Sequence, residues 1–184
     1  MAIMDEMLEY RNADGIVTVY FDEGRQQLDP VVCANVLTLF YKHDRGEELG
    51  NTLAWVLAVL EHRAYLEGTY SYIGGDAFLF FVSRLMGVST SVKERVVFLF
   101  QERVRERFGK EGDALSLAMR ILAAASVGIR DVVDRDTLLT MQELDGGFPM
   151  GWIYKFANAG IRVGNRGLAT ALAVKAIKVV DEME

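Results

Sequence analysis

Four side chains that can bind an anion lie close together near the carboxyl end of the sequence: Lys155, Arg162, Asn165 and Arg166. Residue 165 is also the expected start of the last helix, where free N–H groups and the helix dipole favour negative charge. We therefore predict a diphosphate-binding site here. The alternative is that these residues are surface groups that pair with nearby Asp and Glu.

Aromatic side chains suggest a second kind of chemistry. A pocket lined by aromatic rings is apolar, and the faces of the rings stabilise a carbocation. The candidate lining residues are Tyr72, Phe78, Phe80, Phe81, Phe148, Trp152 and Tyr154. The alternative is that they form an ordinary core, because aromatic residues at helical spacing usually do.

Several common kinds of site are disfavoured by the residue types and their spacing. His43 and His62 lack the spacing of paired metal ligands, and Cys33 is the only cysteine, so we expect neither a metal site nor a disulfide. A nucleophile elbow and a GxGxxG motif are both missing, which gives a hydrolase or a dinucleotide enzyme no support. We expect no cofactor, except Mg²⁺ that arrives with the diphosphate of a substrate.

The composition is typical of one helix-rich domain spanning residues 1–184. Hydrophobic residues make up 51% and charged residues 25%, with only 2 prolines. The net charge of −6 provides no positive field for phosphates, which disfavours binding to nucleic acid or to an anionic membrane. We find no signal peptide and no apolar run long enough for a membrane span, so we expect a cytoplasmic protein.

The positioning elements are helices of two alternating kinds. Helices with few charges are expected at 29–42, 76–86, 113–128 and 165–182, and more charged helices at 49–66, 89–109 and 131–143. A short helix is expected at 3–10 and a strand or extended segment at 16–21. Helices that are apolar nearly all round are buried on several sides. The alternation predicts an all-α protein, an α/α toroid of about four hairpins whose inner ring surrounds a central cavity.

An acidic residue followed by glycine recurs between these helices, at positions 14–15, 67–68, 111–112 and 145–146. Each pair follows a helical stretch and precedes an apolar helix. A hairpin that cannot bury its own apolar face must stack on the next, as in helical-repeat arrays. We interpret the pairs as turns of a repeat; the alternative is chance, because acid–glycine pairs are common in turns.

The stretch QELDGGF at 142–148 carries a resemblance to a known family. It is similar to the QxxDGxW (QW) motif of the prenyltransferase and squalene-cyclase repeat, with Phe148 in the tryptophan position. The resemblance implies a stabilising role, in which Gln142 and Asp145 tie helix ends together and the aromatic ring packs beneath them.

Longer segments, among them DAFLFFVSRL and DGGFPMGWIYKF, resemble the helical terpene-cyclase portion of fungal haloacid-dehalogenase-like proteins. The resemblance implies a class II terpene cyclase that binds farnesyl diphosphate and cyclises it to a drimane-type sesquiterpene. It also implies a haloacid-dehalogenase-like phosphatase domain as a partner. The nucleophile motif of that phosphatase, DxDx(T/V) after an apolar strand, is absent from this sequence.

Class II cyclisation requires a carboxylic acid that stays protonated and transfers its proton to an alkene. The family signature for this acid, DxDD or DxDT, is absent. The nearest match is Asp29, and Asp76 and Asp113 stand at the starts of two other apolar helices. All three are candidate catalytic acids; the alternative is that they cap their helices.

Two functional hypotheses follow. The first is a terpene-cyclase domain that binds an isoprenoid diphosphate in the central cavity. The second is a non-catalytic helical-repeat domain that serves as a scaffold or dimerisation module, which the missing acid motif favours. Known toroids often use five or six hairpins, so a homodimer or an open arc is also expected.

Overall fold

The structure is a computed structural model that describes residues 2–156 and 159–183. Helices account for most of this part of the chain. Their bounds are α1 Ala2–Glu9, α2 Pro30–Lys42, the 3₁₀ helix η1 Gly46–Leu49, α3 Gly50–Glu61, α4 Gly75–Val88, α5 Thr90–Arg105, α6 Ala114–Ala125, α7 Val132–Thr140 and α8 Arg166–Asp181. Two strands, β1 Trp152–Phe156 and β2 Ile161–Gly164, form an antiparallel hairpin before α8.

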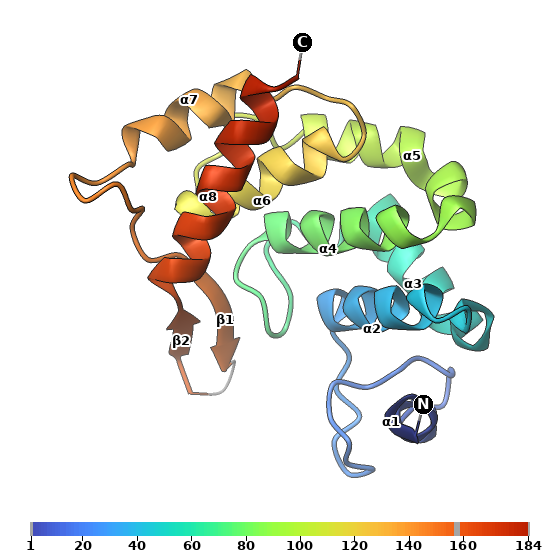
Figure 1. The fold of residues 1–184 in the computed structure, drawn as a ribbon. Coiled ribbons are helices and arrows are strands. Elements are labelled where there is room, and N and C mark those ends of the chain that lie inside the picture. Colours follow the sequence, from blue (N-terminus) through green and yellow to red (C-terminus); the bar gives the residue numbers. More distant parts are fainter. Residues whose placement is uncertain (1, 157–158, 184) are drawn as a thin grey trace.

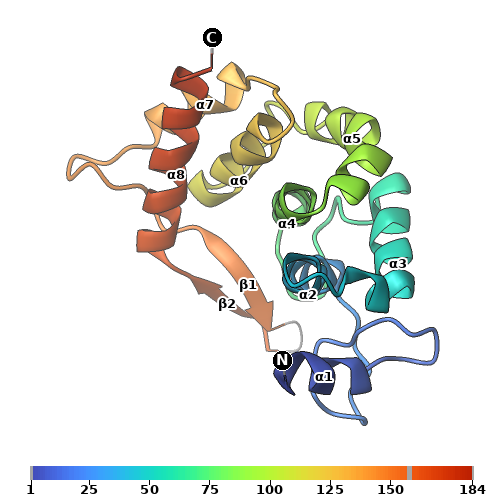
Figure 2. The same ribbon diagram turned by 45° about the vertical axis from the view of Figure 1, so that its right-hand side comes forward.

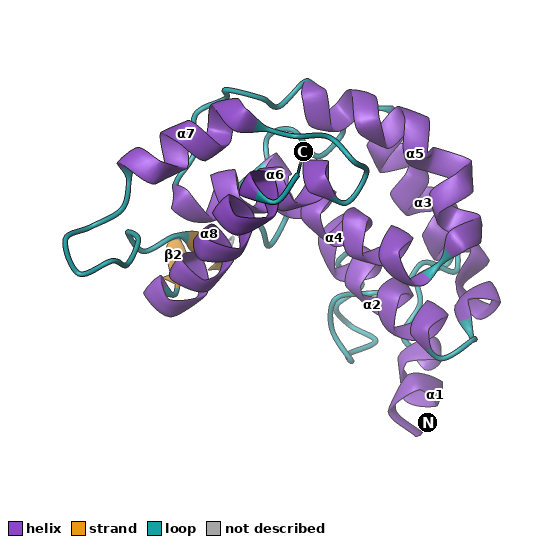
Figure 3. Cartoon of the chain, turned by 45° about the horizontal axis from the view of Figure 1, so that its top comes forward, coloured by secondary structure: helices purple, strands orange, loops and turns teal. Residues whose placement is uncertain are grey.

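The helices are arranged in two layers that curve into an open arc (Figure 3). Helices α2, α4, α6 and α8 lie side by side in the inner layer, each packed against the next (Figures 1 and 2). Helices α3, α5 and α7 form the outer layer, and each packs against the inner helix that precedes it in the chain. The all-α prediction is confirmed. The described residues form an arc of three hairpins and a final helix, and do not close into a ring.

Local sequence signals explain where several helices begin. Asp29 caps α2 and Pro30 occupies its first turn, while Ser89, Asp113 and Asn165 accept backbone N–H bonds at the starts of α5, α6 and α8. The expected cap at Asp76 is wrong, because α4 begins one residue earlier and its N-cap is Gly74. The side chain of Asp76 instead binds two arginines from other elements.

The apolar inner helices carry most of the core. The largest group of buried side chains joins α2, α3, α4 and α5, and a second group joins α6, α7 and α8. Ala118, Ala173 and Ala176 are fully buried where α6 meets α8, and such small side chains allow close approach of the two helices. The outer side of the inner layer is covered by α3, α5 and α7. Helices α5 and α7 are more polar than the inner helices, but α3 is as apolar as they are, so the predicted alternation holds only in part.

The β1–β2 hairpin is the main element that the sequence analysis missed. Trp152 pairs with Gly164 and Phe156 with Ile161. The hairpin is attached to the loop before α4, because the N–H of Lys155 donates to the carbonyl of Ser71 over 2.8 Å. In contrast, the predicted strand at 16–21 makes only an isolated bridge at Val17.

Three of the four acid–glycine pairs share a backbone conformation. Gly15, Gly68 and Gly146 have φ of +76°, +85° and +81°, which L-residues with a side chain rarely adopt. The pair at 111–112 differs, because the glycine with positive φ in that connection is Gly109.

Among the helices of the described residues, none combines the length and apolarity needed to cross a membrane.

Candidate functional site

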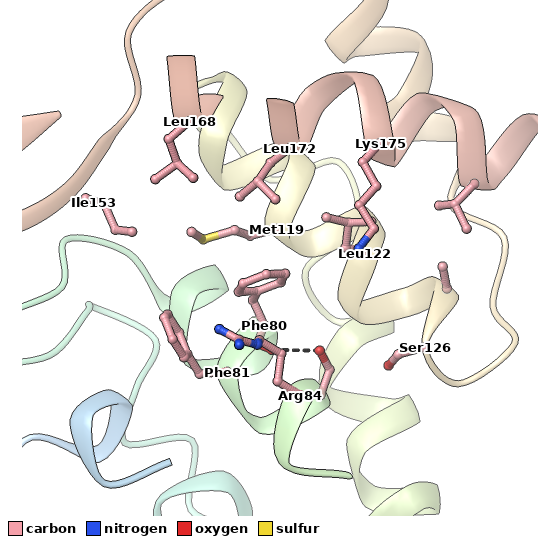
Figure 4. A pocket seen from close by; sticks show the side chains of 13 residues that line it. Phe80, Phe81, Arg84, Met119, Leu122, Ser126, Ile153, Leu168, Leu172 and Lys175 are labelled. Carbon is pink, nitrogen blue, oxygen red and sulfur yellow. Dashed lines mark hydrogen bonds between the residues drawn. The ribbon is translucent and has the colours of Figure 1, made fainter. Parts of the chain in front are cut away.

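An apolar hollow of about 660 Å³ opens on the inner face of the arc. Figure 4 shows that its walls come from α4, α6 and α8, with Ile153 of β1 at one end. The apolar lining consists of Phe80, Phe81, Met119, Leu122, Ala125, Ile153, Leu168, Leu172 and Val179. A hollow of this size and polarity suits a hydrophobic small molecule.

The polar groups of the hollow are few. The Ser83 and Ser126 hydroxyls donate to carbonyls of their own helices, at 2.6 and 2.7 Å. Arg84 and Lys175 are the charged residues of the lining, and both are cations. No Asp or Glu among the described residues lines the hollow, so it carries positive charge within an apolar surround.

Asp29 is fully buried and its carboxylate is held by four donors. One oxygen accepts from the N–H groups of Val31 and Val32, and the other accepts from the Thr69 hydroxyl and the Ser71 N–H, both at 2.7 Å. The same Ser71 holds β1 through its carbonyl. Asp29 thus connects the start of α2 to the loop that supports the hairpin, and it is absent from the lining of the hollow.

Asp76 is also buried, and it lies between two arginines. Arg107 and Arg120 each donate two hydrogen bonds to its carboxylate, all at 3.0 Å. Burial alone would raise the pKa of Asp76, but the hydrogen bonds from the two guanidinium groups outweigh it and lower this pKa. A carboxylate held ionised in this way is a poor proton donor.

Asp113 is the third candidate acid, and it joins two elements. One oxygen caps α6 by accepting from the Ser116 N–H at 2.8 Å, and the other accepts from the Trp152 N–H at 2.9 Å. The contacts of Asp29, Asp76 and Asp113 are therefore those of residues that fix the inner helices and β1. Asp29 and Asp113 cap their helices, as the structural alternative expected, whereas Asp76 does not.

The carboxyl group with the most strongly raised pKa is one that the sequence analysis did not single out. Burial, together with the neighbouring carboxylate of Asp134, raises the pKa of Asp131 to about 7. Asp131 caps α7 in the outer layer and is absent from the lining of the hollow. The group with the raised pKa therefore lies away from the apolar site.

The four residues of the predicted diphosphate site lie in different surroundings. Arg166 donates to Glu143 at 2.6 Å and to Asp145 at 2.7 Å, and Asn165 caps α8. Lys155 on β1 and Arg162 on β2 are opposite each other in the backbone register of the hairpin. Arg166 and Lys155 line separate surface depressions, so the structure does not bring the four groups to one anion.

The predicted aromatic lining is divided among three places. Phe80 and Phe81 line the hollow, with ring centroids 5.6 Å apart and planes at 84°. Phe78 and Phe148 are fully buried in the core. Tyr72 and Tyr154 contact each other edge to face where the hairpin meets the loop before α4, and Trp152 is partly exposed on β1.

The stretch at 142–148 makes contacts that hold α7 to α8. The amide of Gln142 donates to the carbonyl of Gly146 at 2.9 Å, and Asp145 binds Arg166 at the start of α8. Hydrogen bonds from Arg166 and from the Gly147 N–H lower the pKa of Asp145. Phe148 is buried beneath them, and its N–H donates to the Thr170 hydroxyl. The stretch stabilises the fold and lies outside the hollow.

The sequence analysis missed Met119, Leu122, Leu172 and the two cations of the hollow. The positions 168, 172, 175 and 179 recur at helical spacing on α8, and this period was the available signal. It could not separate the face that lines the hollow from the face that packs on α6, because both are apolar.

Comparison with known proteins gives two similarities. Residues 1–43 match the family described as sesquiterpene cyclase astC-like C-terminal domain. The chain is also 47% identical over 178 residues to drimenol cyclase drtB from Aspergillus calidoustus, an alignment that covers 96% of this chain and 34% of that protein. The chain thus spans about a third of the length of this curated relative. No solved structure gives a significant match. Together these similarities support a terpene-cyclase domain.

Proposed function

We propose that this chain is a terpene-cyclase domain that binds farnesyl diphosphate and takes part in its cyclisation to a drimane-type sesquiterpene. The observation that carries the proposal is the apolar hollow on the inner face of the arc. Its lining lies within a chain that is similar, over nearly its whole length, to a drimenol cyclase.

The hollow has the properties that a prenyl chain requires. Its apolar walls exclude water, which would otherwise capture a carbocation. The rings of Phe80 and Phe81 stand at a steep angle to each other, so a ligand can meet the face of one and the edge of the other. An aromatic face stabilises positive charge that develops in the ligand.

We propose that Asp29, Asp76 and Asp113 hold the walls of this site and that the proton comes from elsewhere. Each of the three accepts hydrogen bonds from other elements of the chain. The relative is about three times as long as the aligned segment. We propose that the acid belongs to a part of the protein that corresponds to the region outside this alignment. A haloacid-dehalogenase-like phosphatase domain is the partner that the sequence resemblance suggests. Any Mg²⁺ would arrive with the diphosphate of the substrate.

One observation favours the alternative of a non-catalytic helical-repeat domain. The candidate acids are engaged in contacts that stabilise the arc, as expected of a scaffold. The two functions differ in whether the hollow takes a ligand.

Filling the hollow provides the test of binding. Ala125 lies in the lining, so Ala125→Trp should weaken the binding of farnesyl diphosphate about tenfold or more. Ala171→Trp, on the exposed side of α8, is the matched control and should bind like the wild-type chain. The measurement is isothermal titration of the folded variants. Equal affinity of both variants, or no binding by the wild-type chain, contradicts the proposal.

A chimera tests the catalytic role. The aligned third of drimenol cyclase drtB is replaced by this chain, and the products are analysed after phosphatase treatment. We expect a cyclic drimane-type alcohol from the chimera and none from the same chimera carrying Ala125→Trp. A folded chimera that releases only linear farnesol supports the scaffold reading instead.

A further inference from the structure

Two cations face an apolar space without a counter-ion. Figure 4 shows Arg84 extending from α4 and Lys175 from α8, on opposite sides of the hollow. Both residues are exposed, and neither side chain forms a salt bridge or a hydrogen bond with the described residues.

The other arginines near the inner helices behave differently. Arg107 and Arg120 each bind Asp76, and Arg103 binds Glu106 at 2.8 Å. Their contacts fix the helices to one another. Arg84 instead lies over the ring of Phe81, with its guanidinium carbon 5.7 Å from the ring centroid. This contact orients the guanidinium beside the hollow and leaves its N–H groups available.

The two cations come from helices that do not neighbour each other in the inner layer. Helix α6 lies between α4 and α8 and forms the floor with Met119 and Leu122. A ligand that lies on this apolar floor is therefore flanked by a cation from each of the two helices. This arrangement matches a molecule with a hydrophobic tail and an anionic head, since each part would contact its own kind of surface.

We infer that Arg84 and Lys175 bind the diphosphate head of the ligand while the prenyl tail lies on the floor of the hollow. The inference rests on the proposed function and assigns the head group to residues outside the cluster at 155–166 that the sequence suggested. Arg84 offers paired N–H donors to phosphate oxygens, and Lys175 offers a mobile ammonium charge.

Substitutions that remove the charge but keep an unbranched polar side chain provide the test. Arg84→Gln and Lys175→Gln should each weaken the binding of farnesyl diphosphate about tenfold, because each removes a charge-assisted contact. Both should bind farnesol, which has the same tail without the phosphates, within about twofold of the wild-type affinity. Lys178→Gln is the matched control, since Lys178 lies on the same helix outside the hollow and is 73% exposed.

The outcomes separate the inference from the proposed function. If the wild-type chain binds farnesyl diphosphate no better than farnesol, or if Lys178→Gln loses as much affinity as the other variants, the inference is wrong and the tail site stands. Unchanged affinity in Arg84→Gln and Lys175→Gln likewise places the head group elsewhere, and Arg162→Gln then tests the hairpin. If the folded wild-type chain binds neither ligand, the proposed function fails as well.

Discussion

Asp131 and Asp134 are buried neighbours at the start of α7, and each has one carboxylate oxygen without a hydrogen-bond partner among the described residues. Asp134 also binds Arg120, which binds Asp76 together with Arg107. The two guanidinium groups of Arg107 and Arg120 balance the carboxylates of Asp76 and Asp134. The network is therefore neutral only when Asp131 is protonated. Burial raises the pKa of Asp131 to about 7, and the neighbouring carboxylate of Asp134 adds to this effect.

This proton makes the stability of the fold depend on pH. The ordinary pKa of this carboxyl group is 3.8, and its pKa in the folded protein is about 7. The bound proton therefore stabilises the folded state fully below about pH 4. This contribution is lost as the pH rises through 7. We predict that the free energy of unfolding falls by on the order of 3 kcal/mol between pH 5 and pH 8. Urea unfolding at a series of pH values measures it.

Asp131→Asn isolates the effect. The amide oxygen can still accept the Asp134 N–H and cap α7, but the side chain no longer titrates. The variant should show a flatter pH profile and exceed the wild type in stability at pH 8. Asp136→Asn, an exposed carboxylate on the same helix, should keep the wild-type profile. A wild-type slope in Asp131→Asn would assign the pH dependence to another group.

The loop between α3 and α4 is the element on which the hairpin depends. Asp29 holds this loop from one side through Thr69 and Ser71, and Lys155 of β1 binds it from the other. Within the loop, Gly68 has φ of +85°, and an added Cβ would meet the carbonyl oxygens of Ile73 and Tyr72. Both the backbone conformation and the available space therefore require glycine.

Gly68→Ala should lower the free energy of unfolding by about 2 kcal/mol or more, because it combines backbone strain with a steric clash. Gly87→Ala is the comparison, since this glycine lies inside α4 with open space around it and alanine favours a helix. That variant should be neutral or slightly more stable. Equal unfolding midpoints of the two variants in urea would disprove the role assigned to the loop.

Elements with strong local signals could be predicted, and elements set by distant contacts could not. The capping residues Asp29, Ser89, Asp113 and Asn165 mark helix starts, because capping depends only on adjacent backbone. The environment of Asp76 depends on Arg120, 44 residues away. The hairpin consists of strands of 5 and 4 residues, which are too short to give a clear alternating pattern in the sequence.

At the scale of the whole molecule, alternating helix character predicted the two layers of the arc only in part, because α3 lies in the outer layer but is as apolar as the inner helices. The apolar helices form the inner layer because their neighbours on both sides and an outer helix cover them. The position of the hollow was not predictable, since it depends on how far α4 and α8 stand apart across α6. Homodimerisation stays a prediction that light scattering of the purified chain can test.

The central claim is that the inner face of the arc holds the tail of a prenyl ligand. The most direct measurement is a crystal structure of the chain with a non-hydrolysable analogue of farnesyl diphosphate. We predict electron density for the tail against Met119, Leu122 and Leu172, between α4 and α8. Density for the analogue only at Lys155, Arg162 and Arg166, or a hollow closed by side chains, would contradict the account.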